Sequence, residues 1–382
     1  MIYLDNAATS FPKAPGVAEA MIRTLTEAGG NPGRSGHAMA VAAQGVVDDT
    51  RRRLAALLGV SDRTRIVFTA SATDALNQAL FGLLQPGERV LTSRMEHNAL
   101  ARPLAELTNR GVMVESVATA PDGSIDLDDL EKSLKTHPTR LVAMAHASNV
   151  TGGILPAREV AQLAHAHGAL FLLDAAQTAG VLPLNVNEMG IDLLALPGHK
   201  GLLGPPGTGA LFVAAGICLT PMRFGGTGIH SEDEHMPEDL PERLEAGTLN
   251  TVGLAGLGAA LRFLAERGVA AVRTHEMALT GHLLGGLQNI PGLRIHGLAN
   301  PARQVATVSI TLGGWEPVDL AAVLESSFGI ALRAGLHCAP AAHRALGTFP
   351  GGTVRLSAGC FTTEDDIRQA VSALEQLARS SA

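Results

Sequence analysis

Short apolar segments alternate with amphipathic stretches over the first two thirds of the chain. The apolar segments that predict strands are Arg65–Thr69, Arg89–Ser93, Met113–Val117, Leu141–Ala145, Ala169–Leu173, Leu193–Leu196 and Ala210–Val213. Helical periodicity is found between them, for example at Ala43–Leu58, Thr73–Leu84, Leu127–Leu134 and Ala157–Ala166. Apolar strands without polar alternation, joined by helices, are typical of a largely parallel sheet that is covered on both faces. The pattern therefore predicts an α/β architecture.

The order of elements changes from about Val252. Two long helical stretches come first, and they are followed by mixed strands and helices. These later elements are Val252–Arg267, Val269–Leu287, a strand near Arg294, Val305–Thr311, Pro317–Ser327, Ile330–Arg333, Thr353–Leu356 and Thr363–Arg379. We expect a large domain over residues 15–255 and a smaller α+β domain made of residues 256–382 together with 1–14.

Composition and charge exclude several classes of protein. The 382 residues are 46% hydrophobic and 17% charged, which excludes overall disorder. No apolar stretch reaches the roughly 18–20 residues of a membrane helix. The net charge of −7 comes without a long basic run, so no nucleic-acid partner is expected. Met1–Asp5 carries no signal-peptide pattern, and the three cysteines cannot all pair with one another, so we expect a cytoplasmic protein. No metal site is predicted.

Polar residues follow several of the predicted strands. In open α/β sheets, ligands bind beyond the carboxyl ends of the strands. Ser71 and Thr73 follow the first strand at a helix start, where backbone N–H groups and a hydroxyl can hold a phosphate or simply cap the helix. His97 follows the second strand and Asn149 the fourth. Each of these residues, taken alone, is compatible with an ordinary structural role.

A carboxylate and an isolated lysine follow the next strands. The fifth strand leads directly into Asp174, with Gln177 three residues further on. A buried carboxylate is costly without a partner, so Asp174 pairs either with a structural donor or with a positively charged ligand atom. Lys200 lies in a loop rich in Gly and Pro and is the single lysine after Lys135.

These three features together match one cofactor. Pyridoxal phosphate needs a phosphate cradle, a carboxylate for its pyridinium nitrogen and a lysine amine for its aldehyde. A lysine with a lowered pKa readily forms a Schiff base. The carboxylate keeps the ring nitrogen protonated, so that the ring accepts the electrons of a substrate carbanion. The sequence therefore predicts a pyridoxal-phosphate enzyme.

The chain resembles fold-type I pyridoxal-phosphate enzymes of the class V aminotransferase group, in the cysteine desulfurase/selenocysteine lyase family. The resemblance begins at Tyr3 and covers nearly the whole chain. The motifs that carry it are Tyr3–Thr9, Ser148–Gly152, Asp174–Gln177, Gly198–Lys200, Glu245–Thr248 and Arg333–Ala339. It implies a mostly parallel central sheet and a smaller C-terminal domain.

The resemblance implies a role for each residue around the cofactor. Lys200 would form the Schiff base and later move the α-proton. Asp174 would pair with the pyridinium nitrogen, and Gln177 would donate to the phenolic oxygen. His97 would stack on the ring, or alternatively transfer protons.

Further roles concern the phosphate, the substrate and a second subunit. Thr73 and His199 would hold the phosphate, and Thr248 would reach the cofactor of the other subunit in a homodimer. Asn149 would position the substrate and the ring oxygen, and Arg355 would bind the substrate carboxylate with its two-pronged guanidinium. One position departs from the family, because Pro197 stands where the family has a phosphate-binding serine before Gly-His-Lys.

Cys338 decides the reaction that the resemblance implies. In desulfurases this cysteine takes the sulfur of the substrate and carries it as a persulfide. That role needs a thiolate on a mobile, partly exposed loop. Gly335 is expected to give flexibility, and Arg333 and His337 to favour the thiolate. The alternative for Cys338 is an ordinary buried cysteine. Cys218 has apolar neighbours and is expected to be structural, and so is Cys360.

The predicted function is therefore a cysteine desulfurase. L-cysteine would yield L-alanine and a persulfide on Cys338, from which a sulfur-acceptor protein would take the sulfur. A selenocysteine lyase would use nearly the same residues. Another class V reaction (a C–S lyase, an aminotransferase or an epimerase) is the next alternative, and Pro197 favours it somewhat. A catalytically idle scaffold is disfavoured because Lys200, Asp174, Arg355 and Cys338 are all present.

Overall fold

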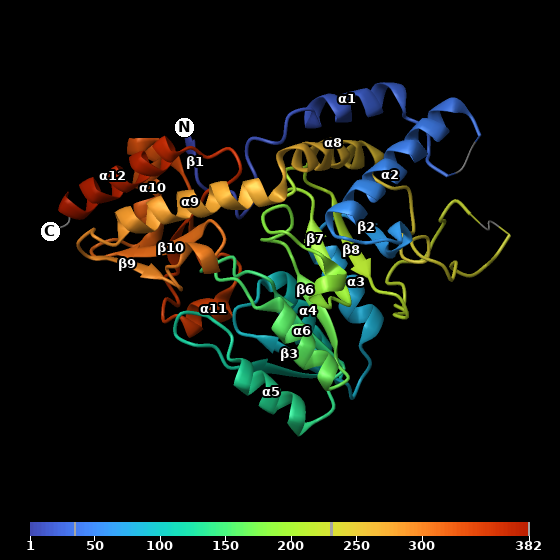
Figure 1. The fold of residues 1–382 in the computed structure, drawn as a ribbon, viewed down its shortest axis with the longest axis horizontal. Helices are drawn as coiled ribbons and strands as arrows, with labels where there is room; N and C mark the ends of the chain where they lie inside the picture. The colour runs from blue at the N-terminus through green and yellow to red at the C-terminus, as the bar shows by residue number, and fades with distance from the viewer. Residues whose placement is uncertain (34–35, 230–231, 381–382) are drawn as a thin grey trace.

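The computed structural model describes residues 1–33, 36–229 and 232–380. Its larger sheet (Figure 1) has seven strands in the order β2-β8-β7-β6-β5-β3-β4. Strand β8 runs antiparallel to both β2 and β7, and the other pairs of neighbouring strands are parallel. The strands are β2 (Ile66–Thr69), β3 (Arg89–Ser93), β4 (Met113–Val117), β5 (Leu141–Ala145), β6 (Leu170–Asp174), β7 (Leu193–Pro197) and β8 (Gly209–Val213). The predicted α/β architecture is therefore present.

Helices cover both faces of this sheet. One face packs against α3 (Ala72–Leu83) and α4 (Asn98–Asn109), and alternate strand residues such as Val90 and Leu172 fill the space between them. The opposite face, which includes Leu91 and Phe171, forms a second core. The helices that contribute several residues to that core are α2 (Ala38–Leu57), α5 (Leu127–Thr136), α6 (Ala157–Ala166) and α8 (Thr251–Arg267). The strands β5, β6, β7 and β8 are buried on both faces, which explains why their sequences do not alternate between apolar and polar residues.

The remaining elements of the larger unit are short or peripheral. Helix α1 (Val17–Glu27) packs against α8, as does α2. The others are η1 (Arg63–Arg65) and α7 (Val186–Met189).

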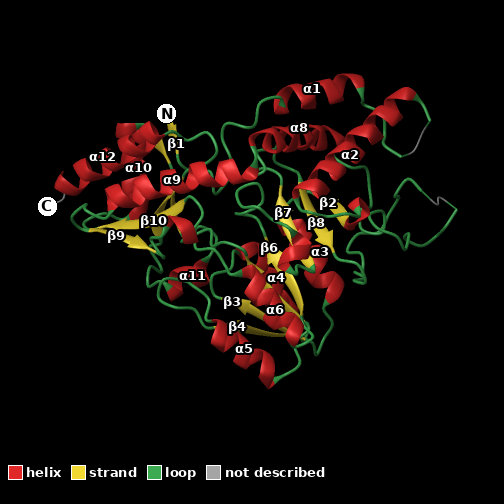
Figure 2. Ribbon diagram, viewed as in Figure 1, coloured by secondary structure: helices red, strands yellow, loops and turns green. Residues whose placement is uncertain are grey.

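A smaller unit contains the rest of the chain. Figure 2 shows its strands grouped apart from the larger sheet, with α9, α10 and α12 beside them. Its antiparallel sheet has the order β12-β13-β10-β9, and β1 pairs separately with β11. Its elements are β1 (Ile2–Tyr3), α9 (Val269–Leu287), β9 (Leu293–His296), η2 (Pro301–Arg303), β10 (Thr307–Leu312), α10 (Pro317–Phe328), β11 (Ile330–Ala331), β12 (Arg333–Gly335), α11 (Pro340–Ala345), β13 (Thr353–Ser357) and α12 (Glu364–Ser380).

The sequence predicted a strand at Ile330–Arg333 and a domain boundary at residue 255 in this region. The single strand expected at Ile330–Arg333 is wrong, because β11 and β12 belong to two different sheets. Ile2 and Leu4 lie in the core of the smaller unit, while α8 packs within the larger one. The division of the chain at residue 255 stays a prediction, and a division at Gly268, between α8 and α9, would leave both cores more nearly whole.

Among residues 1–33, 36–229 and 232–380, no helix combines the length and apolar character needed to cross a bilayer.

Candidate functional site

One cavity of about 240 Å³ lies between the two units and collects most of the predicted site residues. The larger unit contributes the residues that follow its strands, and the smaller unit contributes two arginines, Arg333 and Arg355. The predicted site residues that line the cavity are Thr73, His97, Asn149, Asp174, Gln177, His199, Lys200 and Arg355. Of the predicted set, only Cys338 and Thr248 are outside this lining.

The parallel strands explain why these residues converge. Asp174 is the last residue of β6, Asn149 lies four residues beyond β5, and Lys200 three beyond β7. Neighbouring parallel strands end at the same edge of the sheet, so residues distant in sequence meet there. At the start of α3, the side chain of Ser71 caps the helix by accepting from the backbone N–H of Asp74 at 3.1 Å. The phosphate-site and capping interpretations of this segment are thus compatible, because Thr73 lines the cavity.

Asp174 and Lys200 are ionisable groups in a poorly solvated position. Asp174 is 4% exposed and accepts a hydrogen bond from the backbone N–H of Ala176 at 2.9 Å. Burial raises the pKa of Asp174, and the nearby Lys200 partly opposes that rise. Desolvation lowers the pKa of Lys200 to about 8, although Asp174 acts in the opposite direction. The amine of Lys200 is therefore uncharged more often than an ordinary lysine at neutral pH, as a nucleophile or base requires.

Two of the histidines that line the cavity, His97 and His199, have pKa values well below physiological pH. His97 caps α4, and its Nδ1 accepts from the backbone N–H of Ala99 at 3.0 Å. Desolvation, aided by the charge of Lys200, lowers the pKa of both His97 and His199 to about 4. An uncharged ring at His97 is suited to stacking on a flat ligand.

Glu96 is a group that the sequence analysis missed. Its carboxyl is 3% exposed, with Oε1 2.5 Å from Oγ of Ser93 and Oε2 2.8 Å from the backbone nitrogen of Ala145. Burial raises the pKa of Glu96 to about 8, and the charge of Asp174 acts in the same direction. At neutral pH the Glu96 carboxyl is therefore mostly protonated, and its two oxygens connect Ser93 of β3 to Ala145 of β5 by hydrogen bonds. Its place directly before His97 is the one sequence signal that points to it.

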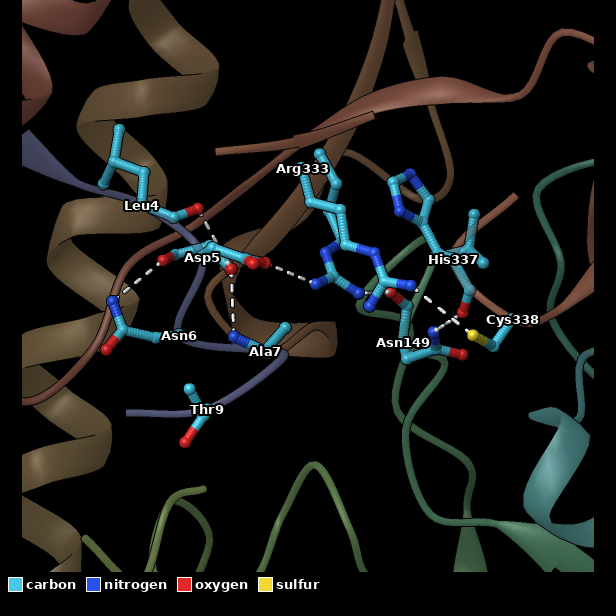
Figure 3. A network of polar contacts seen from close by, with 12 residues as sticks. Leu4, Asp5, Asn6, Ala7, Thr9, Asn149, Arg333, His337 and Cys338 are labelled. Atoms are coloured by element: carbon cyan, nitrogen blue, oxygen red, sulfur yellow. Dashed lines mark hydrogen bonds and ion pairs between the residues drawn. The ribbon is translucent and has the colours of Figure 1, made fainter. Parts of the chain in front are cut away.

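Arg355 is held by two contacts from distant parts of the chain. Its Nη2 donates to Oδ1 of Asp5 at 2.7 Å, and its Nη1 donates to the backbone oxygen of Asn149 at 3.1 Å. Figure 3 labels these two partners, Asp5 and Asn149. Nε of Arg355 and Oδ1 of Asn149 are buried without a hydrogen-bond partner among the described residues. Buried polar atoms of this kind are normally satisfied, so these two mark a place for a ligand. Arg333, the cross-strand neighbour of Arg355, also lines the cavity, which sequence reasoning did not foresee.

Cys338 lies in a short turn between β12 and α11, and it is partly exposed as expected. His337 and Cys338 have φ values of 47° and 57°, which non-glycine residues adopt at a cost. The backbone N–H of Asn98 donates to the Cys338 oxygen at 2.7 Å. Nδ2 of Asn149 donates to the His337 oxygen at 2.7 Å, as Figure 3 shows. The mobile loop expected from the sequence is therefore a turn in which the backbone oxygens of both His337 and Cys338 accept hydrogen bonds from the larger unit.

The surroundings of the Cys338 thiol differ partly from the expectation. Nη2 of Arg333 lies 3.4 Å from Sγ, so the expected neighbour of the thiol is present. His337 does not help, because its Nε2 lies 3.0 Å from Oγ1 of Thr353 and burial lowers its pKa to about 2. Gly335 of β12 pairs with Thr353 and has a φ of 102°, a backbone conformation that favours glycine. Its role is therefore to allow this conformation, and the expected flexibility is not its role.

The other candidates lie elsewhere. Thr248 is exposed, and its expected role requires a second subunit. Cys360 is buried, and burial raises its pKa to about 11, which suits a structural cysteine. Cys218 is exposed, so the apolar setting inferred from its neighbours is wrong.

Comparison with known proteins gives one family for nearly the whole chain. The model of the class-V aminotransferases matches residues 2–370. A probable cysteine desulfurase of Methanothermobacter thermautotrophicus is 34% identical over 383 residues, covering 99% of this chain and 94% of that protein. The predicted family is confirmed by these matches.

Solved structures agree with this result. The apo cysteine desulfurase of Thermococcus onnurineus NA1 superposes with a TM-score of 0.93 at 31% identity, covering 99% of this chain and 95% of that one. The Escherichia coli cysteine desulfurase CsdA gives a TM-score of 0.89 at 30% identity, covering 100% and 95%. The expected fold-type I architecture, with its smaller C-terminal part, is confirmed.

Proposed function

This chain belongs to the aminotransferase class-V family, and we propose that it is a pyridoxal-phosphate-dependent cysteine desulfurase that converts L-cysteine to L-alanine. The observation that carries the proposal is the Cys338 thiol, held 3.4 Å from Arg333 beside the cavity that contains Lys200 and Asp174.

The residues of the cavity fit pyridoxal phosphate. Asp174 is a buried carboxylate without an ion-pair partner among the described residues, as a pyridinium nitrogen requires. Thr73 and His199 would hold the phosphate, Gln177 the phenolic oxygen, and His97 the face of the ring. When bound, the cofactor supplies an aldehyde for the substrate amine and a ring that withdraws electrons from the substrate Cα.

Lys200 would remove the proton from the substrate Cα and return it later. Its lowered pKa of about 8 makes it an effective base near neutral pH. Arg355 would bind the substrate carboxylate with the N–H groups that Asp5 and Asn149 leave free, and the unpaired Oδ1 of Asn149 would accept from the substrate or cofactor.

Cys338 would then receive the sulfur. Its thiolate attacks the substrate sulfur, an S–S bond forms, and the Cβ–S bond breaks with its electron pair left on carbon. Protonation of that carbon gives alanine, and Cys338 keeps the sulfur as a persulfide. The overall change, cysteine plus thiol to alanine plus persulfide, needs no external oxidant or reductant.

We also propose a homodimer. Ile22 and Leu25 on α1 are 64% and 67% exposed, and Phe224 is 73% exposed, which makes these apolar side chains available to a second copy of the chain. Thr248 is exposed as well, as a residue reaching the partner's cavity must be. A cytoplasmic location agrees with three unpaired cysteines. A sulfur-acceptor protein completes the proposed set of partners.

A product assay tests the function. The purified protein is given L-cysteine, L-selenocysteine or L-cysteine sulfinate, and alanine is measured against keto acid. We expect alanine from cysteine in equal amount to protein-bound or released sulfur. Keto acid as the main product would indicate an aminotransferase, and turnover confined to selenocysteine would indicate a selenocysteine lyase.

A matched pair of cysteine variants tests the sulfur carrier. Cys338→Ala should lower sulfur transfer to a thiol acceptor by about a hundredfold or more, and intact-protein mass spectrometry should detect no persulfide. Cys360→Ala, which changes a buried cysteine away from the thiol site, should keep the persulfide. Full sulfur transfer by Cys338→Ala would refute the proposed role of that residue.

A further inference from the structure

Lys13 is a partly buried lysine with no acidic partner among the described residues. Its ammonium donates to Oγ1 of Thr9 at 3.1 Å, Oγ of Ser10 at 3.1 Å and the backbone oxygen of His199 at 2.8 Å. These three acceptors use all three of its protons. Burial lowers the pKa of Lys13 to about 8, because the charged ammonium is less well solvated here than in water. The ammonium therefore ties the N-terminal arm to the loop that carries His199 and Lys200.

The carbonyl of His199 has more donors than it can use. Besides Lys13, it lies within hydrogen-bond distance of the backbone nitrogen of Ser10 at 3.0 Å, Oγ of Ser10 at 3.1 Å and Oγ1 of Thr9 at 3.1 Å. A carbonyl oxygen has two lone pairs, so four donors exceed its capacity. Thr9 has a second acceptor for its hydroxyl proton, because Nδ1 of His199 is also 3.1 Å from its Oγ1.

The charge of Lys13 favours one direction for this second hydrogen bond. The ammonium occupies one lone pair of the Thr9 hydroxyl oxygen, which leaves the hydroxyl proton to be donated. A cation on that side favours a lone pair on Nδ1 over an N–H group, because an N–H dipole pointing at the ammonium is repelled. The neutral state of the His199 ring, whose pKa lies near 4, agrees with this arrangement.

We propose that Lys13, acting through Thr9, is a positioning residue that keeps the His199 proton on Nε2, so that the ring donates a hydrogen bond to a phosphate in the cavity. Nε2 has no hydrogen-bond partner among the described residues, and the His199 ring lines the cavity. Pro197, which lines the same cavity, offers neither an N–H nor a hydroxyl donor. The inference rests on the proposed function and deepens it, since it says how the phosphate end of the cofactor is recognised.

Binding measurements with two aldehydes test this relay. Full-length wild type, Lys13→Met, Thr9→Val and Thr9→Ser, freed of cofactor, are titrated with pyridoxal phosphate and with pyridoxal, which lacks the phosphate. Binding is followed by visible absorbance. Lys132→Met, which changes an exposed lysine on α5, is the matched control.

The relay predicts a loss that depends on the phosphate. Lys13→Met and Thr9→Val should bind pyridoxal phosphate about tenfold or more weakly, and should bind pyridoxal within about twofold of wild type. Thr9→Ser retains the hydroxyl and should stay near wild type, as should Lys132→Met. Equal losses for both aldehydes would assign Lys13 a purely structural role and overturn the inference, and so would unchanged binding of pyridoxal phosphate.

Histidine-selective ¹⁵N NMR of the cofactor-free protein decides the same question without the cofactor. His199→Asn identifies the signal. The expected result is a neutral ring protonated on Nε2 in wild type and a changed pattern in Thr9→Val, whereas a wild-type ring protonated on Nδ1 would overturn the inference. If wild type binds neither aldehyde, the proposed function fails, and the NMR result alone decides the tautomer.

Discussion

The two walls of the cavity use charge in different ways. The strand-end wall consists of Asn149, Asp174 and Lys200 of the larger unit, and its two ionisable groups make no ion pair with hydrogen-bond geometry among the described residues. The arginine wall consists of Arg333 and Arg355 of the smaller unit. There Arg355 is paired with Asp5 at 2.7 Å and Arg333 contacts the Cys338 thiol at 3.4 Å.

This difference matches two kinds of ligand. Groups with shifted pKa values and without partners are costly, and such groups cluster at sites that bind or transform a ligand. The strand-end wall therefore fits a resident cofactor that would supply the missing partners. Arginines keep their charge under almost all conditions, so the arginine wall fits a substrate that arrives with its own carboxylate and leaves.

Removal of the amine should have the largest effect on the strand-end wall. Lys200→Ala removes both the aldehyde partner and the base, so turnover should fall by at least about a thousandfold. The visible absorbance of the bound cofactor should change as well. Lys132→Ala on the exposed face of α5 serves as the control. An unchanged spectrum and rate would mean that this wall does not hold the cofactor.

A substitution that preserves charge should show which of the two arginines binds the substrate carboxylate. Arg355→Lys keeps the charge but loses the two-pronged geometry, so kcat/KM for L-cysteine should fall by about a hundredfold, mainly through KM. Binding of cysteamine, which has no carboxylate, should change little. Arg333→Lys is the comparison, because Arg333 lies directly across the sheet from Arg355. If Arg333→Lys carries the loss in KM and Arg355→Lys does not, the carboxylate site has been assigned to the wrong arginine.

Glu96 should have its main effect on stability. Its pKa is raised from 4.5 to about 8, so the folded state keeps a proton that the unfolded chain loses. The stabilisation from that proton is complete below about pH 4.5 and is lost as the pH rises toward 8. Glu96→Gln imitates the neutral acid, since its amide can donate to Ser93 while its oxygen accepts from Ala145.

Urea unfolding between pH 5.5 and 8.5 measures this effect. Relative to wild type, Glu96→Gln should gain stability with rising pH, by at most about 1.4 kcal/mol per pH unit. Glu364→Gln, at the exposed start of α12, should not alter the slope. A loss of stability in Glu96→Gln that is equal at every pH would show that the native carboxyl is ionised.

Much of the fold could be predicted from local pattern. The predicted bounds of β3, β4 and β5 agree with the structure. For β5 the reason is that a strand buried on both faces is apolar along its whole length. The hydrophobic pattern predicted one strand at residues 330–333, but the structure has two short strands there, β11 and β12, which belong to different sheets. Local periodicity indicates that a segment is extended, but it carries no information about the strand with which it pairs.

The sequence by itself determined which residues meet at the edge of the larger sheet. Asp174, Asn149 and Lys200 follow successive parallel strands, and the geometry of such a sheet brings their positions together. Only the tertiary structure decided the contacts that orient them. The Asp5–Arg355 pair joins residues 350 positions apart, and the bond from Asn98 to the Cys338 turn joins the two units. Contacts at that separation depend on how the units pack, because no local backbone preference of either partner specifies the other.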